Sequence, residues 1–252
     1  MVPGIDKFRE HFAGHEDCYA LIGGSACSLI FDEAGIDFRA TQDIDMVLCV
    51  EVVDGAFATA LKAFLDAGQY QARERGEGRR EFYRFHRPKD PSYPVMLELF
   101  SNTPDALDLV EGAEIAVVSV PDETLSLSAI LLDKDYYEAL QVMRRAIDGV
   151  HVLDEALLIP FKARAFVDLS NRREIGDKYV KGDDIKKHRN DVFRLLQLIP
   201  GNSTIEVTEP LKKDLRSYIE IASAIEGFKP KDFKVDLDPE EGFELLRSIY
   251  QL

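Results

Sequence analysis

The chain has 252 residues, of which 46% are hydrophobic and 31% are charged. This length is enough for a substantial core, as one elaborated domain or two packed lobes. The composition excludes a largely disordered chain. The formal net charge of -15 repels nucleic acid over most of the surface, so a polynucleotide partner would need a local basic patch.

Targeting signals and cysteine content indicate the cellular compartment. No apolar run is long enough to span a bilayer, and the first residues lack the basic-then-apolar order of a signal peptide. Cys18, Cys27 and Cys49 are odd in number and widely spaced, without a Cys-x-x-Cys pair. This pattern indicates buried or idle thiols in a reducing compartment, not a disulfide framework or a zinc site. We therefore expect a cytoplasmic protein with no membrane partner.

The first part of the chain alternates between apolar runs and helical periodicity. Short apolar or alternating runs predict strands, and apolar residues three and four apart predict helices. Helices are expected at 6–15, 26–34, 57–67 and from 136 onward, and strands at 18–22, 43–50, 81–85, 95–100, 116–118, 125–131 and 150–153. This order predicts an α/β (α+β) fold, with a mixed sheet flanked by helices.

From residue 154 the pattern becomes helical. Helices are expected at 155–169, 183–198, 211–224 and in a last segment that ends near Leu252. A proline-bearing connection precedes this last helix. We therefore predict two domains, an α/β lobe of residues 1–153 and a helical C-terminal lobe of residues 154–252.

Gly23, Gly24 and Ser25 stand between an expected strand and an expected helix. Glycines let the backbone turn tightly and approach a ligand closely. The N–H groups at the start of the following helix can hold an anion such as a triphosphate. A plain strand-to-helix turn explains the same residues equally well.

Three acids stand on the expected strands. Asp43 and Asp45 point to one face because side chains two apart on a strand do so. They repel each other unless a cation lies between them, and Mg²⁺ prefers such oxygen ligands; the alternative is a pair of solvated acids. Glu98 interrupts an apolar strand, where burial requires a metal or a buried Arg as partner. The alternative for Glu98 is a side chain that faces solvent.

Together these features describe a site for a phosphate chain and two metals. One metal would activate an attacking oxygen, and the other would stabilise the leaving pyrophosphate. The pattern resembles the DNA polymerase β-type nucleotidyltransferase superfamily, whose fold is a mixed sheet flanked by helices. The segment from Arg39 to Asp45 is similar to the Arg-x-Thr/Ser-x-Asp-Ile-Asp motif of its AbiEii-type branch, which includes toxins of toxin–antitoxin and abortive-infection systems.

In that branch the helical half supplies a Lys and a later Asp. Lys162 matches the Lys, and Asp191, within the segment 187–193, is the counterpart of the Asp. Read from the sequence pattern alone, Lys162 is a solvated residue on an amphipathic helix. Asp191 either holds Lys162 or the attacking group, or caps or salt-bridges its own helix. The similarity covers most of residues 15–200.

The resemblance implies transfer of a nucleoside monophosphate from a nucleoside triphosphate, such as ATP, to an acceptor hydroxyl, with Mg²⁺ or Mn²⁺ as cofactor. The implied catalytic residues are Asp43, Asp45, Glu98, Lys162 and Asp191, the implied metal ligands are Asp43, Asp45 and Glu98, and the implied nucleotide-binding residues are Gly23, Gly24, Ser25 and Lys162. The acceptor would be the 3′ end of tRNA or another RNA, or a protein, and a toxin of this kind would have a cognate antitoxin. The alternatives are a small-molecule (aminoglycoside-type) nucleotidyltransferase and a non-catalytic nucleotide-binding member.

A basic cluster stands out in this acidic chain. It comprises residues 186–189, with Arg172, Arg173, Lys178 and Lys181 upstream. Such a run is usually a solvated helix face interleaved with acids. Its functional interpretation is a landing site for an RNA end or an acidic acceptor.

Overall fold

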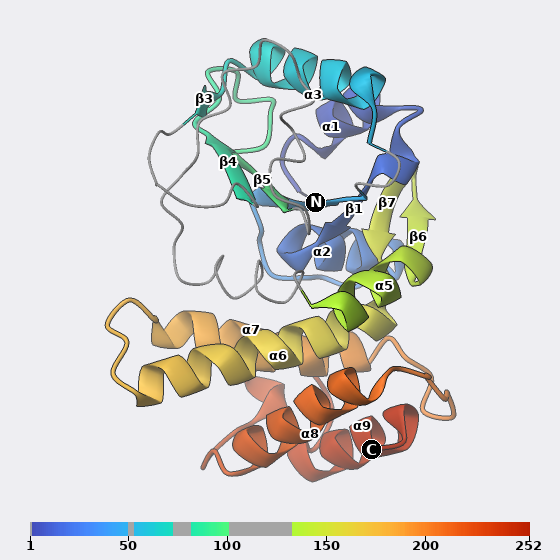
Figure 1. Ribbon diagram of the computed structural model, residues 1–252. Coiled ribbons are helices and arrows are strands. Elements are labelled where there is room, and N and C mark those ends of the chain that lie inside the picture. The colour runs from blue at the N-terminus through green and yellow to red at the C-terminus, as the bar shows by residue number, and fades with distance from the viewer. Residues whose placement is uncertain (1, 50–52, 73–81, 101–132) are drawn as a thin grey trace. The chain divides into compact units, whose positions relative to one another are not determined.

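A computed structural model describes residues 2–49, 53–72, 82–100 and 133–252 (Figure 1). Contacts between residues divide this part of the chain into two compact units. Unit 1 contains the described residues up to Phe100 together with Leu140–Asp154, and unit 2 contains residues 133–139 together with Glu155–Leu252. The strands expected at 116–118 and 125–131 lie outside the described residues.

Unit 1 is built on a mixed sheet, which confirms the predicted α/β class. Within the described residues the sheet has seven strands in the order β3-β4-β5-β2-β1-β7-β6. The pairs β2–β5 and β1–β7 are parallel and the other four are antiparallel. The strands are β1 Tyr19–Ile22, β2 Asp43–Leu48, β3 Gln71–Ala72, β4 Phe82–His86, β5 Met96–Phe100, β6 Arg144–Ile147 and β7 Val150–Leu153.

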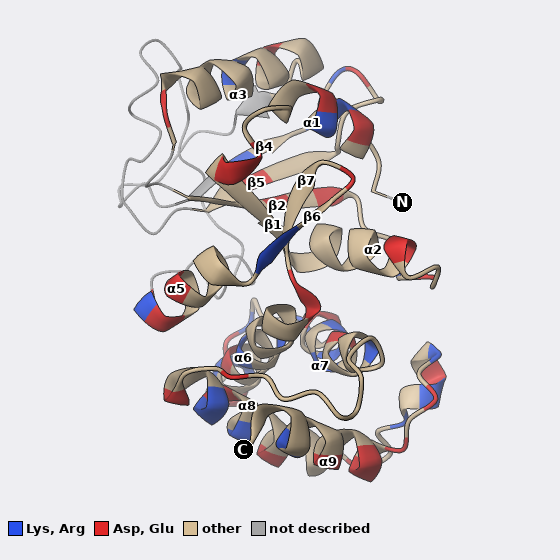
Figure 2. Ribbon diagram, turned by 90° about the vertical axis from the view of Figure 1, so that its right-hand side faces the viewer, with Lys and Arg blue, Asp and Glu red and all other residues tan. Residues whose placement is uncertain are grey.

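Helices cover both faces of this sheet. α1 (Ile5–Phe12) and α3 (Gly55–Gly68) lie on one face, and α2 (Gly23–Glu33) lies on the other (Figures 1 and 2). Between the first two helices, the ring centroids of Phe8 and Phe64 are 6.0 Å apart, and Phe8 also contacts Tyr19 of β1 at 5.3 Å. Packed aromatic rings bury large apolar areas, so this cluster fixes α1 and α3 on the sheet.

The structure differs from the sequence prediction at the start of α2 and in the strand β6. α2 begins at Gly23, whereas the sequence placed its start after the glycines. β6 was not expected; it pairs with β7 through a hairpin whose central residues, Asp148 and Gly149, have φ of 46° and 77°. An Asp-Gly pair with two positive φ values is a favoured two-residue hairpin turn, so a local signal for β6 was present.

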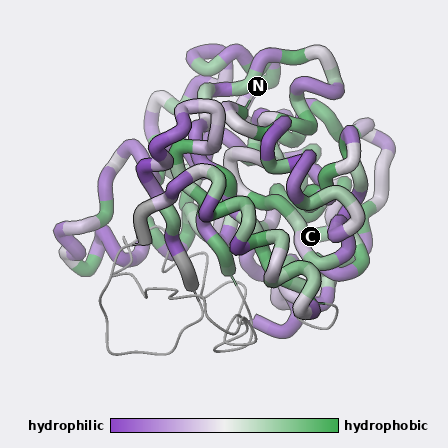
Figure 3. Tube along the Cα trace, turned by 90° about the horizontal axis from the view of Figure 1, so that it is seen from above, coloured by the Kyte–Doolittle hydropathy of each residue, from purple (hydrophilic) through white to green (hydrophobic). Residues whose placement is uncertain are grey.

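Unit 2 is helical, as predicted for this part of the chain. Its helices are α6 Glu155–Glu174, α7 Gly182–Leu196, α8 Glu209–Ser223 and α9 Pro239–Tyr250, and its 3-10 turn is η2 Pro230–Phe233. A second 3-10 turn, η1 Glu16–Cys18, belongs to unit 1. α5 (Lys134–Val142) runs from unit 2 into unit 1. Hydrophobic and hydrophilic stretches alternate along the trace, as amphipathic helices require (Figure 3). No helix in the described ranges combines the length and apolarity needed to cross a membrane.

Candidate active site

The two glycines at the β1–α2 junction are required by close contacts. Gly23 has a φ of 62°, and a Cβ atom there would overlap a carboxylate oxygen of Asp45. A Cβ atom on Gly24 would lie 2.7 Å from Oγ1 of Thr41 and 3.7 Å from the guanidinium of Arg39. Glycine adopts a left-handed backbone conformation at low cost because it has no side chain. The glycines therefore do more than turn the chain, because they let the segment 39–45 lie against the start of α2.

Ser25 is completely buried in this junction. Its hydroxyl donates to the carbonyl of Ile22 at 3.0 Å and accepts from the backbone N–H of Asp45 at 3.4 Å. The hydroxyl thus ties the start of α2 to β2. Ile22, the residue that precedes α2, supplies no side-chain cap, and the first residues of α2 are buried. Backbone N–H groups at a helix start are suited to an anion.

The sheet register aligns three charged side chains across neighbouring strands. β2 and β5 run parallel with Asp45 opposite Glu98, and β5 and β4 run antiparallel with Glu98 opposite Arg84. Nε of Arg84 donates to Oε1 of Glu98 at 2.6 Å. Asp43 stands opposite Met96, two pairs earlier on the same strands. The middle strand of the three therefore carries an acid with an acid on one side and a base on the other.

Glu98 is 5% exposed, so it does not face solvent. Burial is the largest cause that raises its pKa well above the usual value, and the carboxylate of Asp45 adds to the effect. Arg84 opposes the rise in pKa. A buried carboxylate beside another carboxylate resists ionisation, because both the loss of water and the like charge disfavour the anion. Arg84 is the buried arginine partner that the position of Glu98 called for.

The acids provide donors suited to a divalent cation, without forming a complete cage. Across the described ranges, no three His, Cys, Asp or Glu side chains gather closely enough to hold a metal. The sheet register sets Asp45 directly opposite Glu98, so two hard carboxylate ligands already stand side by side. Burial and, after it, the like charge of Asp45 raise the pKa of Glu98, and a cation bound there would oppose both effects. The pair therefore fits a metal, while Asp43 would have to move toward it to complete a set of three.

Lys162 and Asp191 lie in unit 2, on α6 and α7. Lys162 is 4% exposed and Asp191 is fully buried, with 3.4 Å between Nζ and Oδ2. The other oxygen of Asp191 accepts from Nη1 of Arg194 at 2.8 Å. The interpretation of Lys162 as a solvated residue is therefore wrong. The salt bridge of Asp191 within its own helix is present, and a second one to Lys162 accompanies it.

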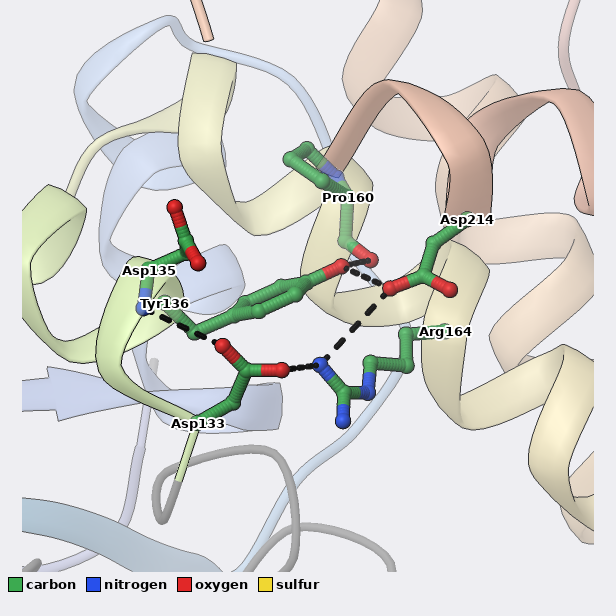
Figure 4. Close-up of polar contacts among 6 residues, drawn as sticks. All are labelled: Asp133, Asp135, Tyr136, Pro160, Arg164 and Asp214. Carbon is green, nitrogen blue, oxygen red and sulfur yellow. Dashed lines mark hydrogen bonds and ion pairs between the residues drawn. The ribbon is translucent and has the colours of Figure 1, made fainter. Parts of the chain in front are cut away.

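A second polar cluster in unit 2 was missed by the sequence analysis. The hydroxyl of Tyr136 donates to Asp214 at 2.9 Å, and Nη1 of Arg164 lies 2.7 Å from Asp133 and 3.7 Å from Asp214 (Figure 4). The guanidinium of Arg164 also lies over the ring of Tyr136, 4.7 Å from its centroid. Burial raises the pKa of Asp214. The cluster joins the start of α5 to α6 and α8, and Arg164 stands only two residues after Lys162.

Comparisons with known proteins add little to this geometry. No family model matches the chain, and no characterised protein is significantly similar to it in sequence. Among solved structures, an antigenic nucleotidyltransferase-like protein from Paracoccidioides brasiliensis is similar over 81% of this chain and 80% of its own, at 17% identity and a TM-score of 0.41. Likeness at this level carries no argument about fold or activity, so the function must be argued from the residues.

Proposed function

We propose that the protein is a metal-dependent nucleotidyltransferase that transfers a nucleoside monophosphate from a nucleoside triphosphate to an acceptor hydroxyl. One observation carries the proposal: Asp45 packs against Gly23 at the start of α2 and meets Glu98 on the next strand. A phosphate-binding helix start and a pair of carboxylates thus occupy one place.

The residues of unit 1 divide the work between binding and orientation. The backbone N–H groups at the start of α2, beside the carboxylate of Asp45, bind triphosphate oxygens. The hydroxyl of Ser25 keeps β2 and α2 in register, so that the acids stand beside this anion site. Asp43, Asp45 and Glu98 would hold Mg²⁺ or Mn²⁺, which supplies charge neutralisation for attack on the α-phosphate and for departure of pyrophosphate. Arg84 orients Glu98.

In unit 2 the resemblance assigns Lys162 to nucleotide binding and Asp191 to catalysis. Its partner Asp191 is itself held by Arg194, so the ammonium group is kept in one orientation by a buried network. The role of Asp191 is therefore to position Lys162.

The acceptor in this proposal is the 3′ end of tRNA or another RNA, or a protein. It is supported by the resemblance of the segment from Arg39 to Asp45 to AbiEii-type toxins. The same resemblance supports a toxin function controlled by a cognate antitoxin. A small antitoxin-like gene next to the gene for this chain would agree with that function.

The proposal is tested by label transfer. The full chain is incubated with each of the four α-labelled nucleoside triphosphates and with total tRNA, protein extract or aminoglycosides, in Mg²⁺ or in EDTA. The double variant Asp43→Ala/Asp45→Ala is compared with Asp37→Ala, which removes an exposed carboxylate from the preceding loop. We expect metal-dependent labelling of RNA or protein that the double variant loses and Asp37→Ala keeps. Labelling that survives in the double variant would disprove the site, and the absence of any metal-dependent nucleotide binding would disprove the enzyme class.

A further inference from the structure

Arg189 of α7 is a half-buried cation without a carboxylate partner. Within the described residues it forms no ion pair, and its only side-chain hydrogen bond runs from Nε to Oδ1 of Asn190 at 3.1 Å. Its guanidinium lies over the ring of Phe228, 4.3 Å from the centroid. Burial lowers the pKa of Arg189, Tyr218 opposes this change, and no carboxylate contributes to the balance. Buried arginines normally have an anion, so the remaining N–H donors of Arg189 point to an anionic ligand.

The backbone of Arg189 is firmly fixed. Its carbonyl accepts from the buried hydroxyl of Tyr218 on α8 at 2.9 Å. Phe228 is itself packed against Phe193, one turn after Arg189 on α7, with ring centroids 4.9 Å apart. The guanidinium is therefore presented on a rigid support, which limits the entropy lost when a ligand binds.

The surface around Arg189 is basic although the chain as a whole is acidic. Residues 182–196 and 229–234 carry seven Lys or Arg and four Asp, against a net charge of -15 for the whole chain. Blue segments mark the basic residues of α7 in Figure 2. The side chains of Lys186, Lys229 and Lys234 are exposed and form no ion pair within the described ranges. A polyanion requires such a local basic surface on an acidic protein.

Flat groups are interleaved with these charges. The rings of Phe228 and Phe233 stack with centroids 6.0 Å apart at 24°, and the guanidinium of Arg194 lies 5.0 Å from the centroid of Phe233. Phe233 is partly exposed, whereas Phe228 is buried, so Phe233 and the half-buried Arg189 are the planar groups that a base could reach. Single-stranded RNA binds through phosphates on Lys and Arg and through bases stacked on aromatic rings and guanidinium planes. A duplex, whose bases are already stacked, would not use these flat groups.

We propose that α7 and η2 form a binding face for single-stranded RNA, with Arg189 at its centre and Lys186, Lys229 and Lys234 as phosphate contacts. An acidic protein would satisfy the charges but leave the stacking groups unused, so RNA is the partner that fits both features. This face gives the RNA of the proposed function a binding surface in unit 2. The catalytic importance of the face rests on that proposed function.

The test measures binding of a fluorescein-labelled oligouridylate to the full chain by fluorescence anisotropy across a salt series, without nucleotide or metal. The double variant Lys229→Gln/Lys234→Gln is expected to bind about tenfold more weakly and to lower the slope of log affinity against log salt by about 1.4, because each phosphate contact contributes about 0.7 for single strands. The matched control, Lys62→Gln/Lys134→Gln, removes the same charge from two exposed lysines elsewhere and is expected to change neither value.

Arg189 is tested with two variants that separate charge from shape. Arg189→Gln is expected to weaken binding about tenfold, within the range of one lost stacking contact. Arg189→Lys keeps the charge but loses the planar group, so most of the loss should remain. Circular dichroism and melting temperatures establish that each variant is folded.

The binding face and the catalytic proposal can fail separately. The variant Asp43→Ala/Asp45→Ala should bind the RNA as tightly as the unaltered chain, because those acids take no part in the face. The inference is overturned if the unaltered chain does not bind the oligonucleotide or binds poly-glutamate equally well. It is also overturned if the two lysine pairs behave alike, or if Arg189→Lys binds as tightly as the unaltered chain. Normal RNA binding without any label transfer would instead count against the enzyme and leave the face intact.

Discussion

The buried network of Lys162, Asp191 and Arg194 predicts a hierarchy of mutational effects. Asp191 is fully buried and contacts both cations, with 3.4 Å to Nζ of Lys162 and 2.8 Å to Nη1 of Arg194. Asp191→Asn removes the negative charge with little change of shape and leaves two cations without compensation. Lys162→Met removes one cation and leaves Asp191 paired with Arg194. The aspartate should therefore matter more than the lysine.

The structure gives the approximate size of each effect. Breaking a buried ion pair by removing one partner costs about 3–5 kcal/mol, so Asp191→Asn should lower the free energy of unfolding by that amount. Lys162→Met should cost about 1 kcal/mol, because an apolar side chain of similar length replaces a buried ammonium whose partner stays satisfied. The double variant should cost less than the sum of the two, with a coupling of about 1–3 kcal/mol.

Urea unfolding of the single and double variants measures these values. Lys134 and Glu138 form the control pair, because their side chains also stand 3.4 Å apart but are 83% and 64% exposed. The cycle Lys134→Gln/Glu138→Gln should give a coupling below about 0.5 kcal/mol. If Asp191→Asn destabilises no more than Lys162→Met, or if both cycles give the same coupling, the argument from burial is refuted.

Three further changes follow from the same contacts. Gly23→Ala and Gly35→Ala both place a side chain at positive φ, at a cost of about 1–2 kcal/mol each. Of the two positions, only Gly23 lacks space for the Cβ atom, so Gly23→Ala should destabilise the protein more and also abolish nucleotide binding. Equal melting temperatures of the two variants would contradict this. Tyr136→Phe removes the donor to Asp214 and should lower the free energy of urea unfolding by about 1–3 kcal/mol, and an unchanged value would show that this hydrogen bond does not hold α5. Because the pKa of Glu98 is raised on folding, its contribution to stability is present below its usual pKa of 4.5 and is lost as pH rises through the folded-state value. In EDTA, the variant Glu98→Gln should therefore show a smaller decline of stability with rising pH than the unaltered chain. Parallel pH profiles of the two proteins would disprove the shift.

Local periodicity was sufficient for most of the described elements. The alternation around Asp43 and the apolar run before Gly23 predicted β2 and β1, and the structure contains both. Two residues of β3 carry too little periodicity to be read as a strand. The Asp148–Gly149 turn held enough information to predict the β6–β7 hairpin, because this pair favours the positive φ values that it adopts.

Partners on distant strands cannot be read from a single sequence. The position of Glu98 indicated a metal or an arginine as partner, and Arg84 lay within an expected strand. Their meeting depends on the register of β4 against β5, and a slip by one residue would turn either side chain to the opposite face. Composition and periodicity constrain which face a residue occupies, but the pairing is decided by packing and turns elsewhere.

The register also bears on the chemistry of the acids. The sequence places Asp43 and Asp45 on one face, and that spacing alone favours them as the metal pair. Neighbouring strands, however, lie about 4.7–4.9 Å apart, whereas residues two apart on one strand are about 6.6 Å apart. Parallel pairing sets Asp45 beside Glu98, and the carboxylate of Asp45 helps to raise the pKa of Glu98. A cation should therefore bind first between Asp45 and Glu98, so Glu98→Gln should weaken Mn²⁺ binding, measured by calorimetry, at least as much as Asp43→Asn. A larger loss with Asp43→Asn would return the metal to the Asp43–Asp45 pair.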